Sequence, residues 1–208
     1  MYSNGMATSS SVQFFDAQFQ RQVCAGALEL NPFEVIALPH LRGRVLDFGC
    51  GLGNLAATAA RSGCSVLALD ASHTAIAHLQ NVASSEGLPV EAVQADLRAY
   101  ELGEDFDAVV SIGLLMFFDC PTAFRQLTQL QSHVRPGGTL VVNVLVEGTT
   151  FLEMFDVQGH CLFGRDEMLK RFAGWKILRS DSQDFSAPGN TVKSFVTLVA
   201  QKSLSTAS

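Results

Sequence analysis

The chain has 208 residues and a formal net charge of -6; 48% of its residues are hydrophobic and only 16% are charged. This balance excludes an intrinsically disordered chain, and the acidic balance argues against a nucleic-acid partner, because no basic surface would neutralise phosphates. The longest apolar run, residues 108–118, is much shorter than the roughly 20 residues that a membrane-spanning helix needs, so we expect no membrane association.

Two helices are expected before the first strand. Residues 1–11 are polar and uncharged, unlike a signal peptide, and we expect them and residues 203–208 to be frayed tails. Apolar residues recur at helical spacing from residue 16 to residue 30, where Asn31 and Pro32 would end the helix. A second, short helix is expected over residues 33–38.

From residue 44 onward, short apolar runs alternate with amphipathic segments. Strands are predicted at 44–50, 65–70, 90–95, 106–111 and 139–146, helices at 54–62, 73–86, 121–134 and 166–172, a turn at 135–138, and two last strands at 175–180 and 191–200. Regular alternation predicts a parallel sheet covered on both faces. The last two strands, with no helix between them, predict an antiparallel hairpin at one edge.

The five cysteines are odd in number and widely spaced, with no C-x-x-C pair. Such spacing is typical of neither a disulfide framework nor a zinc site. We therefore expect reduced cysteines, no metal and a cytoplasmic location.

A glycine-rich loop follows the first predicted strand, with the sequence Leu-Asp-Phe-Gly-Cys-Gly-Leu-Gly-Asn at residues 46–54. Gly49, Gly51 and Gly53 omit side chains where a ligand would approach the backbone closely. In such sheets ligands bind beyond the carboxyl ends of the strands. Asp70 ends the second strand, where it could accept hydrogen bonds from ribose hydroxyls, and Asp96 follows the third strand at the same edge.

Two cofactor classes compete for this loop, because residues 51–56 also satisfy the G-x-G-x-x-A pattern of dinucleotide-binding proteins. A dinucleotide brings a pyrophosphate, yet Arg61 is the only basic side chain between Gly49 and Arg98. Asp47, Asp70 and Asp96 make the expected rim acidic. Coulomb complementarity favours a cationic ligand such as S-adenosylmethionine over a nicotinamide dinucleotide.

Residues 45–53 resemble the first motif of class I S-adenosylmethionine-dependent methyltransferases, and later motifs of that family follow in order at Asp70, 94–97, 106–111 and 135–138. The resemblance covers residues 33–201. It implies an α/β, Rossmann-like seven-stranded sheet that is mostly parallel, with an antiparallel last strand, helices on both faces and S-adenosyl-L-methionine as the cofactor. The cofactor-binding residues that it and the motif spacing predict are Asp47, Gly49, Cys50, Gly51, Gly53, Asp70, Ala71, Asp96, Leu97 and Ser111.

A narrower resemblance joins residues 13–19, 111–118 and 163–175 to the tellurite-resistance methyltransferases of bacteria, which act on small chalcogen oxyanions. That group carries a His-Arg pair and a further Arg around its last two strands. Here Lys193 is the only basic residue at positions 185–194. An oxyanion would be bound better by several positively charged side chains. The resemblance thus implies a small-molecule methyl acceptor, with thiol and chalcogen compounds as candidates.

Aromatic and methionine side chains gather in the segments expected to cap the cleft. The predicted acceptor pocket consists of Phe15, Phe19, Met116, Phe117, Phe151 and Phe155, with His160 as the candidate base. We expect one domain, in which residues 1–40 cap a cofactor-binding core at 44–146 and residues 147–201 supply an insertion and the hairpin, as a monomer or homodimer. A nicotinamide-dependent oxidoreductase and a protein that binds the cofactor without turnover remain alternatives.

Overall fold

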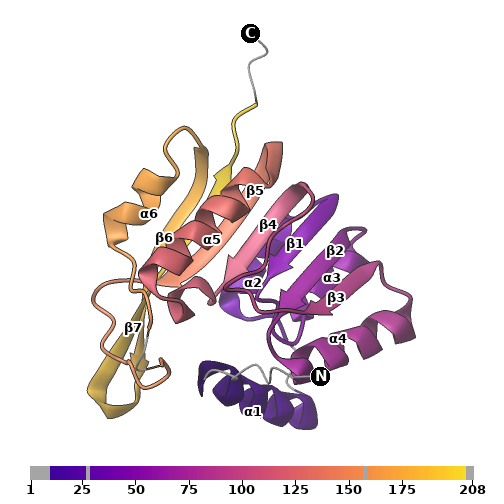
Figure 1. Cartoon of the computed structure of the whole chain (residues 1–208), viewed down its shortest axis with the longest axis horizontal. Helices are drawn as coiled ribbons and strands as arrows, with labels where there is room; N and C mark the ends of the chain where they lie inside the picture. Colours follow the sequence, from indigo (N-terminus) through magenta and orange to yellow (C-terminus); the bar gives the residue numbers. More distant parts are fainter. Residues whose placement is uncertain (1–9, 27–28, 157–158, 205–208) are drawn as a thin grey trace, which may run out of the picture.

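The computed structural model describes residues 10–26, 29–156 and 159–204. Its centre is a seven-stranded sheet in the order β3-β2-β1-β4-β5-β7-β6 (Figure 1). The strands are β1 (Arg44–Phe48), β2 (Ser65–Asp70), β3 (Val90–Gln94), β4 (Phe106–Ile112), β5 (Val134–Leu145), β6 (Lys176–Ala187) and β7 (Thr191–Gln201). The first five strands pair in parallel and β7 is antiparallel to both of its neighbours. The predicted fold class is confirmed.

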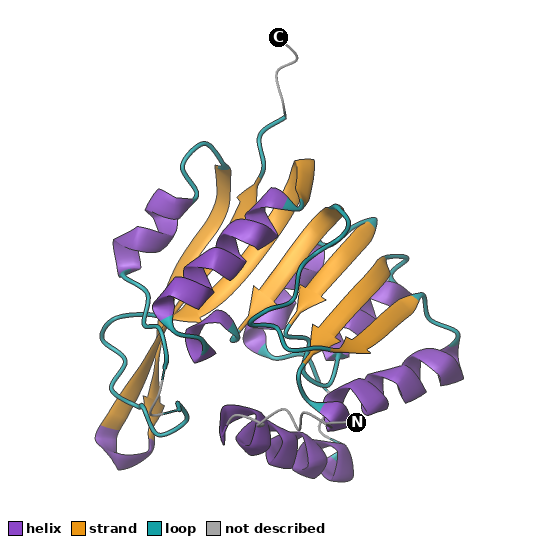
Figure 2. Cartoon of the chain, viewed as in Figure 1, coloured by secondary structure: helices purple, strands orange, loops and turns teal. Residues whose placement is uncertain are grey.

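Two strand boundaries differ from the prediction. β5 begins at Val134 instead of after the expected turn, because Val134 pairs with Phe106 before the register shifts at Ala108 and Thr139. β6 extends to Ala187, well beyond the predicted end at residue 180, because it pairs along the whole of β7. The two strands thus form a long hairpin that projects past the carboxyl ends of the parallel strands (Figure 2).

The helices follow the predicted order, with small shifts at their ends. They are α1 (Ser10–Ala25), α2 (Pro32–Ala37), α3 (Asn54–Arg61), α4 (His73–Glu86), α5 (Cys120–Ser132) and α6 (Arg165–Arg171). α1 starts inside the expected N-terminal tail and ends five residues before the predicted end. The rest of both expected tails, residues 1–9 and 205–208, lies outside the described residues.

Local sequence signals account for several helix boundaries. Ser72 caps α4 by accepting a hydrogen bond from the Ala75 amide, and Gly87 ends it in the left-handed conformation, with φ of 64°. Asn31 and Glu34 form a reciprocal capping box at the start of α2.

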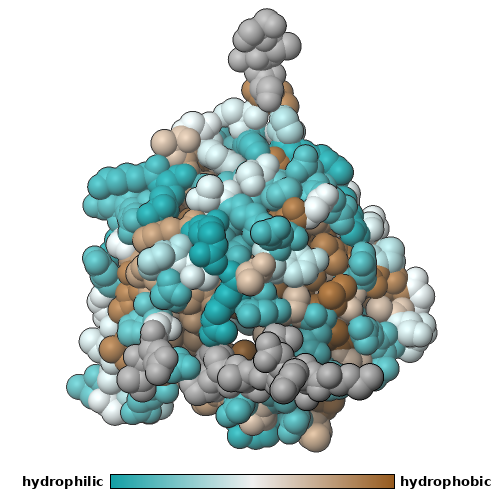
Figure 3. Space-filling view, viewed as in Figure 1, coloured by the Kyte–Doolittle hydropathy of each residue, from teal (hydrophilic) through white to brown (hydrophobic). Residues whose placement is uncertain are grey.

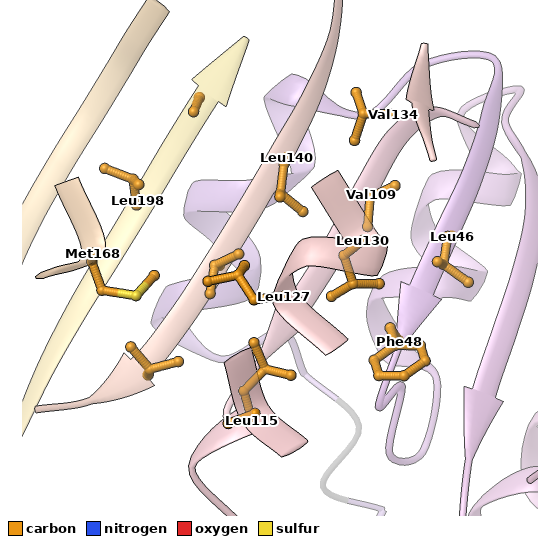
Figure 4. Packing of buried hydrophobic residues seen from close by; sticks show 14 of the residues in the cluster. Leu46, Phe48, Val109, Leu115, Leu127, Leu130, Val134, Leu140, Met168 and Leu198 are labelled. Atoms are coloured by element: carbon orange, nitrogen blue, oxygen red, sulfur yellow. The ribbon is translucent and has the colours of Figure 1, made fainter. Parts of the chain in front are cut away.

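Helices cover both faces of the sheet. α2, α3 and α4 pack on one face, where Ala37, Leu55 and Ile76 are buried. On the other face, α5 and α6 place Leu127, Leu130 and Met168 against strand residues (Figure 4). These strand residues include Leu46, Val109, Leu140 and Leu198. α1 stands apart from these layers and lies across the carboxyl ends of the parallel strands (Figure 1).

The surface seen in Figure 3 mixes hydrophilic and hydrophobic residues. None of the helices in the described part of the chain is long and apolar enough to cross a membrane.

The expectation of fully reduced cysteines is wrong. Cys120, at the start of α5, forms a disulfide with Cys161 in the segment between β5 and α6. The two residues are 41 positions apart in the sequence, so spacing alone gave no sign of the pair. Cys24, Cys50 and Cys64 are free, and the described residues hold no cluster of potential metal ligands.

Candidate functional site

A cavity of about 670 Å³ is lined by residues from the carboxyl ends of the parallel strands and from α1. This volume is typical of a small-molecule site. Its wall is built from the glycine loop, the ends of β1, β2 and β5, the helices α1 and α2, the 3-10 helix η2 (Leu115–Phe117), the insertion after β5 and the β6-β7 hairpin.

The glycine loop forms part of the cavity lining, which we call the carboxylate end because Asp47 and Asp70 lie beside the loop. Gly49, Gly51 and Gly53 all have positive φ, a conformation that glycine adopts without the steric cost of a side chain. Gly49 and Gly51 line the cavity. Gly53 does not; a Cβ atom there would lie 2.5 Å from the Leu79 side chain, so this glycine allows α3 and α4 to pack closely.

Asp70 is fixed at the end of β2 by the backbone. Its Oδ2 accepts a hydrogen bond from the Gly51 amide at 2.9 Å and its Oδ1 accepts one from the Ser72 amide at 2.8 Å. Burial raises the pKa of this carboxyl, and the amides of Ser72, Gly51 and Ala71 oppose that rise. Each oxygen keeps a lone pair, so the group can still accept hydrogen bonds from a diol in the cavity.

Asp47 lies deeper, at the end of β1, with only 4% of its surface exposed. Its Oδ2 is buried and has no hydrogen-bond partner among the described residues. Burial, with the nearby carboxylates of Glu34 and Asp70, raises the pKa of Asp47 to about 8. Because burial disfavours the charged form of this carboxyl, a cation that enters the cavity would stabilise that form.

Most of the predicted cofactor-binding residues share this end of the cavity. The residues that line it are Asp47, Gly49, Cys50, Gly51, Asp70, Ala71, Asp96 and Leu97. Ser111 does not: it is fully buried, and its hydroxyl has no hydrogen-bond partner among the described residues.

A second group of lining residues is aromatic or carries a thioether, and we call it the aromatic end of the cavity. It comprises Phe15, Phe19, Met116, Phe117 and Phe151; that these residues bind an acceptor stays a prediction. Phe117 connects two segments there, with its ring 5.0 Å from that of Phe15 and 5.1 Å from that of Phe155.

Phe155 and His160 lie one layer behind the lining. The ring of His160 stacks on Phe155 at 4.6 Å, and neither residue lines the cavity. The geometry thus gives the predicted base no contact with the cavity, and a role for His160 in catalysis stays a prediction.

Sequence reasoning missed several lining residues, namely Phe33 and Glu34 of α2, Asn143 of β5, and Phe195 of β7. Glu34 occurs in a capping-box pattern, which has a structural explanation of its own. The others come from strands or helices whose positions over the cavity depend on tertiary packing.

α1 forms part of the cavity wall and is attached beside Asp70. Its Asp16 carboxylate accepts hydrogen bonds from the hydroxyls of Ser72 and Thr74, and Phe19 lies next to Gly51. α1 therefore contributes both to the glycine-loop side of the wall and, through Phe15, to its aromatic part.

Comparison with known proteins agrees with this geometry. Residues 45–138 match the protein family described as "Methyltransferase domain". The chain is 29% identical over 169 residues to hemagglutinin 1 of Eikenella corrodens, covering 76% of this chain and 54% of that protein. It is 24% identical over 166 residues to the probable S-adenosyl-L-methionine-dependent methyltransferase TehB of Haemophilus influenzae, covering 76% of this chain and 57% of TehB. The chain thus spans about half the length of these curated relatives.

Solved structures share the fold. The crystal structure of Haemophilus influenzae TehB superposes with a TM-score of 0.71 at 21% identity, covering 83% of this chain and 62% of that chain. The structure of a DhpI-SAH complex superposes with a TM-score of 0.62 at 20% identity, covering 93% and 96% of the two chains. The match over residues 45–138 thus shows a methyltransferase domain in this part of the chain, and the solved structures share its fold.

Proposed function

We propose that this protein transfers the methyl group of S-adenosylmethionine to a small-molecule acceptor, with a thiol or another chalcogen compound as the acceptor class. The observation that carries the proposal is one cavity whose lining combines carboxylates beside the glycine loop with a group of aromatic and thioether side chains.

The carboxylate end fits the cofactor. Among the described lining residues five are acidic, Glu29, Glu34, Asp47, Asp70 and Asp96, and two are basic, Arg98 and Lys193. When bound, S-adenosylmethionine supplies an electrophilic methyl group on a cationic sulfur. Asp70 would accept hydrogen bonds from the ribose hydroxyls, and Asp47, which lines the cavity beside the glycine loop, would lie near the cationic methionine end.

The aromatic end fits a small acceptor with an apolar body. Phe15, Phe117 and Phe151 would exclude water and hold the acceptor against the methyl group, and alignment of this kind supplies much of the acceleration of a displacement. A thiolate is nucleophilic enough to react without a strong base beside it. This suits an end of the cavity that His160 does not reach.

Similarity to TehB supports a small acceptor, but the charge at the aromatic end argues against an oxyanion. Among the described lining residues, the β6-β7 hairpin contributes one basic side chain, Lys193. Its ammonium lies over the Phe151 ring, 4.5 Å from the ring centroid. A small oxyanion would be held better by several convergent cations. We therefore place thiols, which bind in their neutral form and react after losing a proton to water, ahead of tellurite.

A transfer assay with a labelled methyl group tests the proposal. Purified protein is incubated with labelled S-adenosylmethionine and, separately, phenylmethanethiol, 2-mercaptoethanol, phenol, selenite or tellurite. Label should pass to at least one thiol. The Asp70→Ala variant should bind S-adenosylmethionine about tenfold more weakly, a loss of about 1.4 kcal/mol. Tight cofactor binding without transfer to any of these acceptors would favour a protein that binds the cofactor without turnover.

A further inference from the structure

We propose that Asn143 selects methyl acceptors that carry a hydroxyl group, as a hydrogen-bond donor, beside the atom that receives the methyl group. This inference rests on the proposed function and specifies the acceptor further. Asn143 belongs to β5, lines the cavity and is fully buried.

Only one half of the Asn143 amide group has a partner. Its Nδ2 donates a hydrogen bond to Thr197 Oγ1 of β7 at 2.9 Å, whereas its Oδ1 has no hydrogen-bond partner among the described residues. A buried carbonyl oxygen without a partner is unfavourable and uncommon in folded proteins. Because Asn143 lines a cavity, a ligand can supply the missing partner. An amide oxygen only accepts hydrogen bonds, so the ligand group must be a donor.

The position of Asn143 in the sheet assigns this donor to the acceptor. β4 lies between β5 and β1, and the cofactor loop and Asp70 follow β1 and β2. Side chains two residues apart on a strand point to the same face of the sheet. Leu145 therefore shares a face with Asn143, and it packs with Met116 and Phe117 of the aromatic end. A group that reaches Asn143 thus belongs to the molecule held by the aromatic end.

The chemistry of a thiol acceptor indicates which of its groups is recognised. A thiol is a weak hydrogen-bond donor, and it loses its hydrogen before the sulfur attacks the methyl group. Asn143 Oδ1 therefore suits a second group on the acceptor, such as a hydroxyl. A site that is built to bind a hydroxyl discriminates against an analogue with a methyl group in its place, because the buried oxygen then stays unpaired.

The test measures kcat/KM for methyl transfer to two pairs of thiols. The first pair, 2-mercaptoethanol and 1-propanethiol, differs by a hydroxyl in place of a methyl group. The second pair, 2-methoxyethanethiol and 1-butanethiol, differs by an ether oxygen, which accepts hydrogen bonds but cannot donate them. Within each pair, the ratio of the two kcat/KM values is compared between proteins, which cancels the intrinsic reactivity of the thiols.

Two variants are compared with the wild-type protein. The double variant Asn143→Leu with Thr197→Val replaces both members of the buried hydrogen bond by apolar side chains of similar size, so neither partner is left unpaired. Gln18→Leu is the matched control, because it removes a partly exposed amide group from the lining of the same cavity.

The kcat/KM ratio of 2-mercaptoethanol to 1-propanethiol should be about tenfold higher in the wild-type protein than in the double variant. Gln18→Leu should keep the wild-type ratio, and the ratio for the second pair should differ by less than about twofold between all three proteins. An unchanged first ratio in the double variant, or an equal fall in Gln18→Leu, overturns the inference but leaves the proposed function intact.

The wild-type protein alone decides the matter if the double variant does not fold. A preference for 2-methoxyethanethiol over 1-butanethiol as strong as that for 2-mercaptoethanol over 1-propanethiol would mean that a donor of the protein reads the oxygen, and it would overturn the inference. Transfer to selenite or tellurite but to none of these thiols would also overturn the inference alone. Without transfer to any acceptor, the proposed function fails, and this inference with it.

Discussion

The Asp16 carboxylate on α1 accepts a hydrogen bond from the hydroxyl of Ser72, the residue that caps α4. The same carboxylate accepts hydrogen bonds from the amide and the hydroxyl of Thr74. Ser72 also donates its backbone amide to Asp70. The attachment of α1 and the orientation of the expected ribose ligand therefore depend on one short segment, residues 70–74.

Removing this attachment should loosen the cover of the cavity. Asp16→Ala removes the carboxylate that accepts three hydrogen bonds at the N-terminus of α4. Each of these partly exposed bonds contributes on the order of 1 kcal/mol. We expect S-adenosylhomocysteine to dissociate about three- to tenfold faster, because α1 opens more often. Stopped-flow measurement of the dissociation rate checks this. Asp16→Asn, which keeps one acceptor oxygen, should give an intermediate rate, and an unchanged rate in Asp16→Ala would show that α1 is held by its aromatic contacts instead.

Asp47 should make cofactor binding depend on pH. Its pKa of about 8 in the free protein means that it is largely protonated at pH 7, whereas an ammonium beside it favours the ionised form. Binding of S-adenosylhomocysteine at pH 7 should therefore release up to one proton, and affinity should rise with pH until about pH 8. Calorimetry in buffers of different ionisation enthalpy measures the release.

The Asp47→Asn variant is the control for this proton. It should bind S-adenosylhomocysteine more weakly, and the part of the proton release that belongs to Asp47 should disappear.

The Asp47 carboxyl also makes the stability of the ligand-free protein depend on pH, but in the opposite direction to cofactor affinity. Its folded-state pKa lies above the unfolded value of 3.8, so the ligand-free protein binds more protons than the unfolded chain, and this contribution to stability is lost as pH rises toward about 8. Proton release equal in wild type and Asp47→Asn would contradict the assignment.

The sequence predicted those features that depend on neighbouring residues, and it missed those that depend on contacts between residues far apart in the chain. The strands β1, β2 and β4 are apolar runs that end in turn residues, and Asp70 is placed by the end of its own strand, so local patterns sufficed. β6 lacks such a pattern, because most of its side chains are exposed, and its length is set by pairing with β7. α2 contacts β4, which brings Glu34 to the cavity wall, and Cys161 is brought to Cys120 across 41 residues. No local pattern carries either contact.

The Cys120–Cys161 disulfide should stabilise the wall of the cavity. It ties the insertion after β5 to the start of α5, next to the point where the Cys161 amide donates a hydrogen bond to the Met116 carbonyl. A loop of this length contributes roughly 2–4 kcal/mol in the chain-entropy account. Cys161→Ser should therefore lower the melting temperature by roughly 5–15 °C.

Thiol counting tests the bond directly. After denaturation without reductant, alkylation should modify three of the five cysteines, Cys24, Cys50 and Cys64. Modification of all five under the same conditions would mean that the disulfide does not form in the isolated protein, and Cys161→Ser should then melt close to the wild-type temperature.

Phe117 should contribute to acceptor binding with little effect on the cofactor. Its ring lines the aromatic end and contacts both Phe15 of α1 and Phe155, which lies behind the lining, and no ring contact or hydrogen bond joins it to Asp47 or Asp70 in the described part of the chain. Phe117→Ala removes the middle ring of this row, so the KM for a thiol acceptor should rise about tenfold, the loss of one well-packed aromatic contact. Affinity for S-adenosylhomocysteine should stay within about threefold.

Phe124→Ala separates this effect from a general loss of stability. Phe124 packs edge-to-face on Phe163 at 5.4 Å and lies outside the cavity, so its truncation also removes an aromatic pair. We expect both variants to melt at lower temperature, because each loses a partly or fully buried ring, but only Phe117→Ala should raise the KM. If the two variants raise the KM equally, the change reports loosened packing, and the aromatic end would have no specific part in holding the acceptor.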